Sequence, residues 1–235
     1  MRARLTFSIN GFPLAFRLGV VSFVKECIRS ESKTFYHQLF HIRERQCKPF
    51  TFAVYFPRLK VQDDTIIADQ MIITISSVSY ELMMYLFNGS QKNREYLYKK
   101  YSMNLSKFEL LREKQISSSR IWMTTLSPIL VEDKEGKPVL FNQANFEREF
   151  NIIMQKRLRS SENRDLYRPL IFRTIRMKKM VIKENFHQDI KDYLYFTTNT
   201  GDFLIEGDIR DLEYLYKNGC SLRSQLGFGM VDLLG

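Results

Sequence analysis

The chain has 235 residues, 44% of them hydrophobic, a length that suits either one large domain or two compact domains. Lysine and arginine outnumber acidic residues by 36 to 26, and the resulting formal net charge of +10 attracts polyanions such as nucleic acid or an acidic membrane surface. Three widely spaced cysteines without a C-x-x-C pair argue against a disulfide framework and a structural zinc site. Basic residues interrupt each apolar stretch near the N-terminus, so no segment there resembles a signal peptide. No run approaches the ~20 apolar residues of a membrane span, and we therefore expect a cytoplasmic protein.

The first half of the chain predicts the order strand, helix, strand, strand, helix, strand. Strands are indicated by alternating or β-branched and aromatic runs, and helices by apolar residues at helical spacing. In chain order we expect a strand at residues 1–9, helices at 14–28 and 32–41, strands at 50–61 and 65–76, helical segments at 79–87 and 92–101, and a strand at 105–116.

The second half repeats this order approximately. We expect a strand at residues 121–131, a helix at 142–159, a basic strand at 169–182, a hairpin joining 193–198 to 202–206 around Asn-Thr-Gly, a helix at 208–217 and a last strand at 227–234. The pattern predicts an α+β protein of two tandem ferredoxin-like (RRM-like, βαββαβ) domains. We place these domains at residues 1–118 and 119–235, and expect them to pack side by side because no Gly/Ser/Pro-rich linker separates them.

The charges of the second half are segregated. Residues 148–183 contain 11 lysines and arginines against three acidic residues, whereas residues 184–216 contain eight acidic residues against two basic ones. Such a pattern indicates an electropositive face, although a solvated helix surface remains an alternative.

A glycine-rich segment at residues 219–229 is the most specific local motif. Three glycines within eleven residues let backbone N–H groups approach an anion, and arginine, serine and glutamine supply further donors. The Gly-Lys-Ser/Thr of a nucleotide P-loop is absent, and a strand is expected to follow instead of a helix. A structural glycine-rich turn is the alternative interpretation.

Histidine is scarce, and two of the three histidines lie four residues apart. His37 and His41 would share one face of the predicted helix, whereas His187 is distant in the sequence. A zinc site needs further ligands, and no cysteine or acidic residue has matching spacing nearby, so we expect no metal and no cofactor. The pair suits acid–base catalysis, with two ordinary surface histidines as the alternative.

Several segments resemble the CRISPR-associated endoribonucleases of the repeat-associated (RAMP) superfamily, which process CRISPR precursor transcripts. The similarity rests on Arg-Leu-Thr-Phe at 4–7, Leu-Phe-His at 39–41, Lys-Pro-Phe-Thr-Phe at 48–52, Leu-Ser-Pro-Ile-Leu-Val at 126–131, Gly-Asp-Phe-Leu-Ile-Glu-Gly at 201–207 and Gly-Phe-Gly at 227–229. It implies two ferredoxin-like domains that bind one RNA repeat and cut it once without metal. The ribose 2′-hydroxyl attacks the phosphate, leaving a 2′,3′-cyclic phosphate and a 5′-hydroxyl.

The resemblance assigns roles to particular residues. His41 matches the usual catalytic histidine, and His37 is expected to take the complementary acid or base role. Lys48 is expected to stabilise the developing charge, and Tyr36 to orient the nucleophile. RNA contacts are expected from basic residues within 157–179 and from Gly219, Ser221, Arg223, Ser224, Gln225, Gly227, Gly229, Arg120 and Arg173.

The expected partner is CRISPR repeat RNA, with other CRISPR effector subunits and a homodimer as further candidates and no membrane partner. The competing hypothesis is a non-catalytic RNA-binding subunit of the same ribonucleoprotein machinery. That function needs only the basic face and the glycine-rich segment, whereas cleavage also needs positioned acid–base groups.

Overall fold

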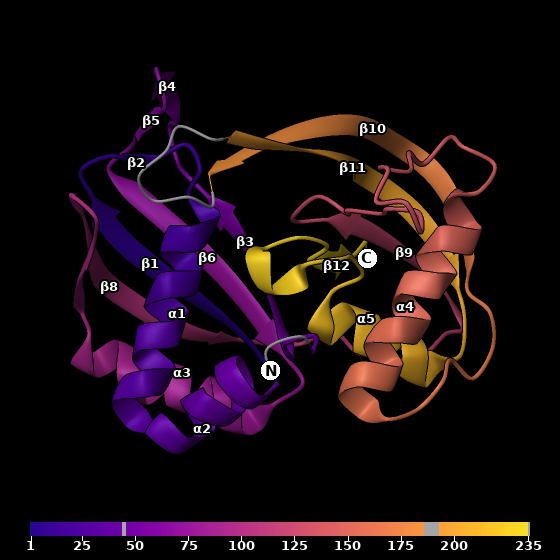
Figure 1. Cartoon of the computed structure of the whole chain (residues 1–235), viewed down its shortest axis with the longest axis horizontal. Coiled ribbons are helices and arrows are strands. Elements are labelled where there is room, and N and C mark those ends of the chain that lie inside the picture. The colour runs from indigo at the N-terminus through magenta and orange to yellow at the C-terminus, as the bar shows by residue number, and fades with distance from the viewer. Residues whose placement is uncertain (44–45, 186–192, 235) are drawn as a thin grey trace. The chain divides into compact units, whose positions relative to one another are not determined.

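The structure is a computed structural model that describes residues 1–43, 46–185 and 193–234 (Figure 1). The chain forms two compact units that exchange short segments. Unit 1 comprises Met1–Arg45, Val54–Leu111 and Lys183–Leu194, and unit 2 comprises Gln46–Ala53, Arg112–Ile182 and Tyr195–Gly235. The division into domains at 1–118 and 119–235 stays a prediction, because the units are interleaved rather than consecutive.

The first half of the chain contains a five-stranded sheet with the order β3-β6-β1-β8-β7, in which β1 is antiparallel to both β6 and β8. Alternate residues of β1 are buried, as the alternating pattern predicts. A small sheet has the order β2-β5-β4. The elements are β1 (Arg2–Ile9), β2 (Phe12–Pro13), α1 (Arg17–Glu31), α2 (Lys33–His37), η1 (Gln38–Ile42), β3 (Phe50–Tyr55), β4 (Lys60–Gln62), β5 (Thr65–Ile67), β6 (Gln70–Ser77), α3 (Tyr80–Lys92), β7 (Glu95–Tyr98) and β8 (Tyr101–Leu111).

Unit 2 is built on a four-stranded sheet with the order β10-β11-β9-β12, in which β9 is antiparallel to β11 and β12. Phe172 stacks on Phe203 at 4.5 Å between ring centroids and contacts Phe146 and Phe150 of α4, each at 5.0 Å. The elements are β9 (Arg120–Thr125), α4 (Phe146–Glu162), β10 (Ile171–Asn185), β11 (Tyr193–Glu206), α5 (Ile209–Asn218), η2 (Ser224–Leu226) and β12 (Val231–Leu233).

The two sheets share one topology. The four strands of the βαββαβ order are β1, β3, β6 and β8 in the first half, and β9, β10, β11 and β12 in the second. In each sheet these strands lie in the same spatial order, which is second, third, first, fourth. This is the ferredoxin-like arrangement, so the predicted fold class is confirmed, with β7 and the small sheet as additions to the first half.

Two predicted elements are wrong. Residues 92–101, expected to be helical, contain β7 and the turn into β8. The expected hairpin around Asn199 is one continuous strand, β11. The buried Asn199 side chain accepts a hydrogen bond from the Phe141 backbone at 2.8 Å and donates to Val139 at 3.1 Å. Gly201 has a φ of +132°, and a Cβ there would lie 1.9 Å from the Arg176 carbonyl oxygen, so this glycine permits a close approach rather than a turn.

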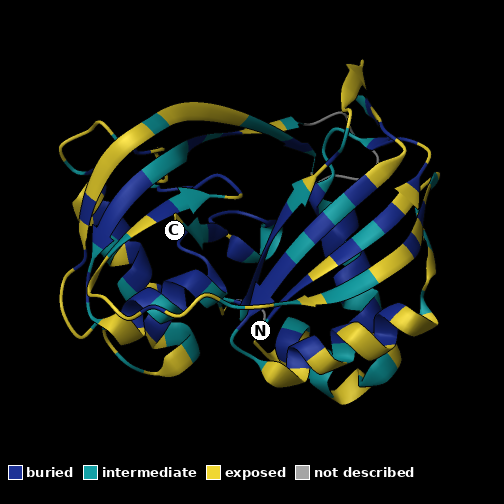
Figure 2. Cartoon of the chain, turned by 180° about the vertical axis from the view of Figure 1, so that it is seen from behind, coloured by how far each residue is buried: buried dark blue, intermediate teal, exposed yellow. Residues whose placement is uncertain are grey.

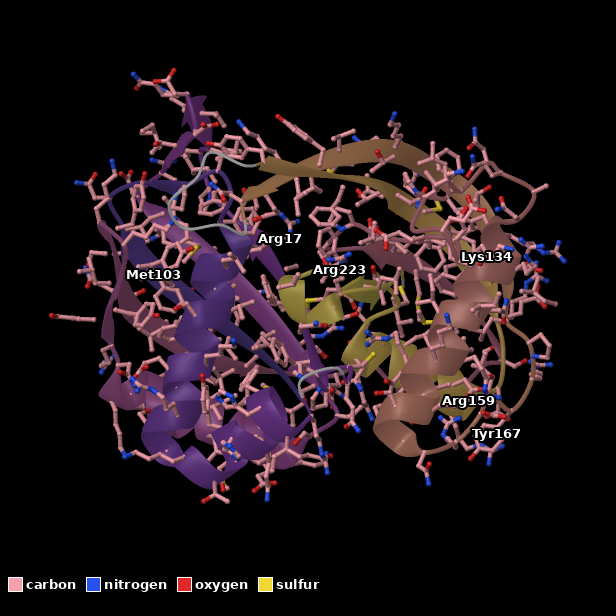
Figure 3. All side chains as sticks on the ribbon, viewed as in Figure 1. Arg17, Met103, Lys134, Arg159, Tyr167 and Arg223 are labelled. Carbon is pink, nitrogen blue, oxygen red and sulfur yellow. The ribbon has the colours of Figure 1, made fainter. Side chains whose placement is uncertain are left out.

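A buried ion pair joins the first turn of α1 to the end of β10 within unit 1. The guanidinium of Arg17, at the start of α1 in Figure 3, donates to the Glu184 carboxylate at 2.7 Å. Burial raises the pKa of Glu184 above its usual value, against the opposing effect of Arg17. The pair is therefore costly to desolvate, and removing one partner leaves a buried charge without its counter-charge.

Within the described ranges, none of the helices combines the length and apolar character needed to cross a membrane.

Replacing one member of the buried pair should destabilise the protein strongly. We expect Glu184→Leu to lower the free energy of unfolding by about 3–5 kcal/mol, measured by urea denaturation. Glu109→Leu removes a half-buried surface carboxylate that pairs with the exposed Lys107 at 2.7 Å and should cost at most about 1 kcal/mol. Equal losses in both variants would show that the buried pair contributes no more than a surface contact.

Candidate functional site

The two histidines lie on a helix that changes its winding between them. The Ser32 hydroxyl caps α2 by accepting a hydrogen bond from the Phe35 backbone at 3.1 Å. After His37 the chain continues as one π-helical turn, η1, in which the Arg43 backbone N–H donates to the Gln38 carbonyl at 3.0 Å. Such turns are rare in proteins, and those that occur are often found at functional sites. Hydrophobic periodicity carries no signal for this turn.

The imidazoles of His37 and His41 stack on each other. Their ring centroids are 5.2 Å apart with 22° between the planes, and both residues are exposed. The half-buried Tyr36 meets His41 edge-on at 5.6 Å. The spacing in the sequence thus predicts the pairing of the histidines. Two solvent-accessible imidazoles at this separation can exchange protons with two atoms of one bound group.

Lys48 lies in unit 2, in the segment that precedes β3. Its side chain is buried, with 6% of the residue exposed, and Nζ donates to the Gln46 carbonyl at 3.1 Å. The neighbouring Cys47 backbone N–H donates to the Ser160 hydroxyl at 3.2 Å. The ammonium charge is therefore held largely away from water, where charges interact more strongly than at a surface.

Metal ligands do not cluster in the part of the chain that the structure describes, where no group of three or more histidine, cysteine or acidic side chains is placed to hold an ion. His187 lies outside the described residues.

The glycine-rich segment is largely buried within unit 2. The Ser221 hydroxyl accepts from the Leu130 backbone at 2.7 Å, and the Ser224 hydroxyl donates to the Ser221 carbonyl at 3.0 Å. The backbone N–H groups of Gly219, Gly227 and Gly229 donate to protein carbonyls. These polar groups are thus engaged in folding the segment rather than directed to solvent.

The three glycines are required by the geometry of the segment. All have a φ between +69° and +80°, which other residues adopt only with strain. A Cβ on Gly227 would lie 2.5 Å from the Phe52 ring, and one on Gly229 would lie 2.3 Å from the Ser221 Cβ. Both contacts are too close, so the structural interpretation of the glycines holds here. Their role in RNA binding stays a prediction.

Arg157 supports this segment from inside and does not belong to an exposed basic face. It is 2% exposed, and its guanidinium donates to the Ser221 carbonyl at 3.1 Å and to the Asn218 carbonyl at 2.8 Å. The expectation that basic residues from position 157 onward reach RNA phosphates is therefore wrong for this arginine.

Arg223 and Gln225 are the polar side chains of residues 219–229 that reach solvent. Arg223 lies on the segment before β12 (Figure 3), with its guanidinium 5.2 Å from the centre of the Phe196 ring and 4.0 Å from the Glu132 carboxylate. Both contacts are long, and the arginine side chain stays 45% exposed, so its donors remain available to an anion.

A second group of exposed cations lies on the sheet of unit 2. Arg120 and Arg173 flank a single carboxylate, that of Glu206, at 3.5 and 3.8 Å. The exposed stretch of the edge strand β10 (Figure 2) adds Lys178 and Lys179. Around Glu206 two arginines face one carboxylate, and this excess of positive charge is expected of a surface that attracts phosphates.

Comparison with known proteins agrees with the resemblance in the sequence. Residues 111–233 match the family model described as CRISPR associated protein Cas6, C-terminal. A search of curated protein sequences finds no match.

Solved structures share the fold over the full length. One described as an RAMP protein binding different RNA substrates has a TM-score of 0.81 at 19% identity, with 100% of each chain covered. One described as the product of a Cas6-related gene from Pyrococcus furiosus has a TM-score of 0.80 at 18% identity, covering 100% of this chain and 99% of that one. A Cas6 product complex has a TM-score of 0.69 at 12% identity, with 99% of each chain covered.

Adding one methyl group at Gly229 should test how tightly the segment is packed. We expect Gly229→Ala to lower the free energy of unfolding by roughly 2–5 kcal/mol, because left-handed strain adds to a clash with backbone atoms. Gly136→Ala is the matched control, since Gly136 has a φ of +78° and an added Cβ would meet nothing within 4 Å beyond its neighbours in the chain. It should cost only about 1–2 kcal/mol. Urea denaturation giving equal values for both would contradict tight packing around Gly229.

Proposed function

The chain belongs to the CRISPR-associated Cas6 family, and from this premise we propose that it is a metal-independent endoribonuclease that binds CRISPR repeat RNA and cuts the precursor transcript. Among the similar structures, one is described as an RAMP protein binding different RNA substrates and another as a Cas6 product complex. Those descriptions support RNA as the ligand and cleaved RNA as the product.

The proposed reaction is an internal transesterification. A base removes the proton of the ribose 2′-hydroxyl, whose oxygen forms a bond to the adjacent phosphorus. The bond from phosphorus to the 5′-oxygen of the next nucleotide breaks, and an acid protonates that oxygen. The products are a 2′,3′-cyclic phosphate and a 5′-hydroxyl, and the transition state carries extra negative charge on the phosphate oxygens.

The stacked pair of His37 and His41 carries this proposal. One imidazole acts as the base and the other as the acid, and a separation of 5.2 Å between ring centroids lets both reach one phosphate and its neighbouring oxygens. Tyr36, edge-on to His41 at 5.6 Å, orients that ring or the nucleophile. Exposure of both histidines leaves them accessible to a polymer substrate.

Lys48 is the proposed source of the positive charge that stabilises the transition state. Its buried ammonium group is already desolvated by the fold. Little reorganisation is then needed when negative charge develops on the phosphate, and this preorganisation is what makes a fixed cation effective.

For RNA binding we propose contacts from Arg223, Gln225, Arg120 and Arg173, whose side chains are exposed or half-exposed. The buried residues of the glycine-rich segment contribute by fixing the backbone that carries Arg223 and Gln225. These buried residues are Gly219, Ser221, Ser224, Gly227 and Gly229. Contacts of this kind are made mainly to phosphates and position the RNA rather than read its sequence.

Substituting His41 should separate chemistry from binding. In EDTA, we expect His41→Ala to lower the single-turnover cleavage rate of a CRISPR repeat RNA by roughly 10²–10⁴-fold, the usual contribution of a general acid or base. RNA affinity, measured by fluorescence anisotropy, should stay close to that of the unmodified protein.

Gln38→Ala is the matched control, because Gln38 is exposed on the same turn and lies between the two histidines. It should cleave at the unmodified rate. If neither the unmodified protein nor the control cuts repeat RNA that both bind tightly, the competing hypothesis of a non-catalytic RNA-binding subunit replaces the enzyme.

A further inference from the structure

Unit 1 contains a pocket of about 380 Å³ that none of the assigned roles uses. It lies between the segment after β2, the start of β5, the turn from β7 to β8, the last residues of β10 and the first residue of β11. Its lining combines aromatic rings with cations, chiefly Tyr98, Lys99, Lys100, Tyr101, Lys183 and Tyr193.

Two of the tyrosines form a supported wall. The fully buried Phe12 packs against Tyr98 with 6.0 Å between ring centroids and against Tyr101 with 5.8 Å. The Tyr101 hydroxyl lies 3.4 Å from the Thr65 hydroxyl. These rings are already held in place, so a flat ligand that stacks on them pays little entropic cost for fixing side chains.

The third tyrosine is fixed by a single carboxylate. Asp64 accepts hydrogen bonds from the Tyr193 hydroxyl at 2.6 Å and from the Lys183 ammonium group at 2.7 Å. Lys183 also lies 3.7 Å from the centre of the Tyr193 ring. The backbone carbonyl of Asp64 accepts from the Leu14 N–H at 2.8 Å, so the main chain that carries this carboxylate is also held. Both strand ends are thereby held at the pocket.

The pocket carries an excess of positive charge. Its lining has three lysines against one aspartate. Lys99 and Lys100 are exposed at the turn between β7 and β8, and their nearest described interactions are with the rings of Tyr98 and Tyr101, at 5.7 and 5.5 Å. Ring contacts do not neutralise an ammonium group, so both lysines can bind an anion.

We propose that this pocket binds one unpaired nucleotide of the RNA, with the base stacked on the tyrosines and the phosphate held by Lys99 and Lys100. The inference rests on the proposed function and extends it to a second contact away from the histidines. Stacking platforms beside a basic groove are how proteins hold single-stranded nucleic acid without reading its sequence. The volume of about 380 Å³ falls within the range of small-ligand pockets.

The charge of the pocket is tested with the full chain and a fluorescein-labelled 20-nucleotide oligouridylate. We expect Lys99→Ala/Lys100→Ala to weaken binding by about 5–25-fold near 0.1 M salt, and to reduce the slope of log K against log salt by about 0.7 per lost phosphate contact. Lys92→Ala/Lys107→Ala removes the same charge from exposed positions in unit 1 that pair with Glu31 and Glu109. Equal losses in the two double variants would overturn the proposal.

The position of the base is tested by photocrosslinking an oligouridylate that carries 5-iodouridine, followed by mass spectrometry of the peptides. A crosslink to Tyr98, Tyr101 or Tyr193 supports stacking in the pocket. Crosslinks confined to peptides outside it overturn the placement of the base.

These experiments separate the pocket from the catalytic proposal, because oligouridylate binding does not depend on cleavage. If the unmodified protein cuts repeat RNA while both double variants bind alike, the pocket proposal fails alone. If repeat RNA is not cut but the pocket variant still binds oligouridylate more weakly than its control, the catalytic proposal fails and the pocket remains.

Discussion

The buried ion pair between Arg17 and Glu184 is a constraint that the arrangement of unit 1 has to satisfy. A single carboxylate from the end of β10 lies against the first turn of α1, at 2.7 Å from the guanidinium. Since a buried carboxylate is tolerated only with a partner, this contact holds the Glu184 stretch of β10 against α1. The adjacent Lys183 and the facing Tyr193 both donate to Asp64, and these contacts form one side of the aromatic pocket.

Unit 2 uses a buried cation in a comparable way. Arg157 of α4 donates to the Ser221 carbonyl of the glycine-rich segment and to the Asn218 carbonyl just before it, which its guanidinium reaches together because it presents several donors in one plane. The positive φ values of Gly219, Gly227 and Gly229 let the backbone fold tightly around those contacts. Arg223 therefore projects from a backbone that is already fixed. Less conformational entropy is lost when such a side chain binds a ligand, and the affinity rises without any new contact.

The sequence predicts the succession of strands and helices along the chain and the pairing of the histidines, because both follow from periodicity. Spacings of two and of about 3.6 residues mark β1 and α1 correctly, and a separation of four brings His37 and His41 onto one face. The π-helical turn that follows His37 is not marked by such spacing.

Other features depend on tertiary contacts that local patterns do not carry. In the turn from β7 to β8, Lys99 has a φ of +54°. This left-handed conformation is uncommon for residues other than glycine, so a lysine in the sequence does not predict it. Asn199 and Gly201 are residue types typical of turns, yet both lie inside the continuous strand β11. The density of glycines at 219–229 predicts an unusual backbone, but not that its N–H groups are directed into the protein.

In the proposed mechanism, the ribose 2′-hydroxyl next to the scissile phosphate is the nucleophile and the stacked histidines move its proton. The most direct test places a single 2′-deoxy nucleotide at each position of a repeat RNA and measures cleavage in EDTA. We predict one cut, lost at one deoxy position only, with a 2′,3′-cyclic phosphate on the product. Cleavage at every deoxy position, or a cut that needs a divalent metal, would contradict this mechanism.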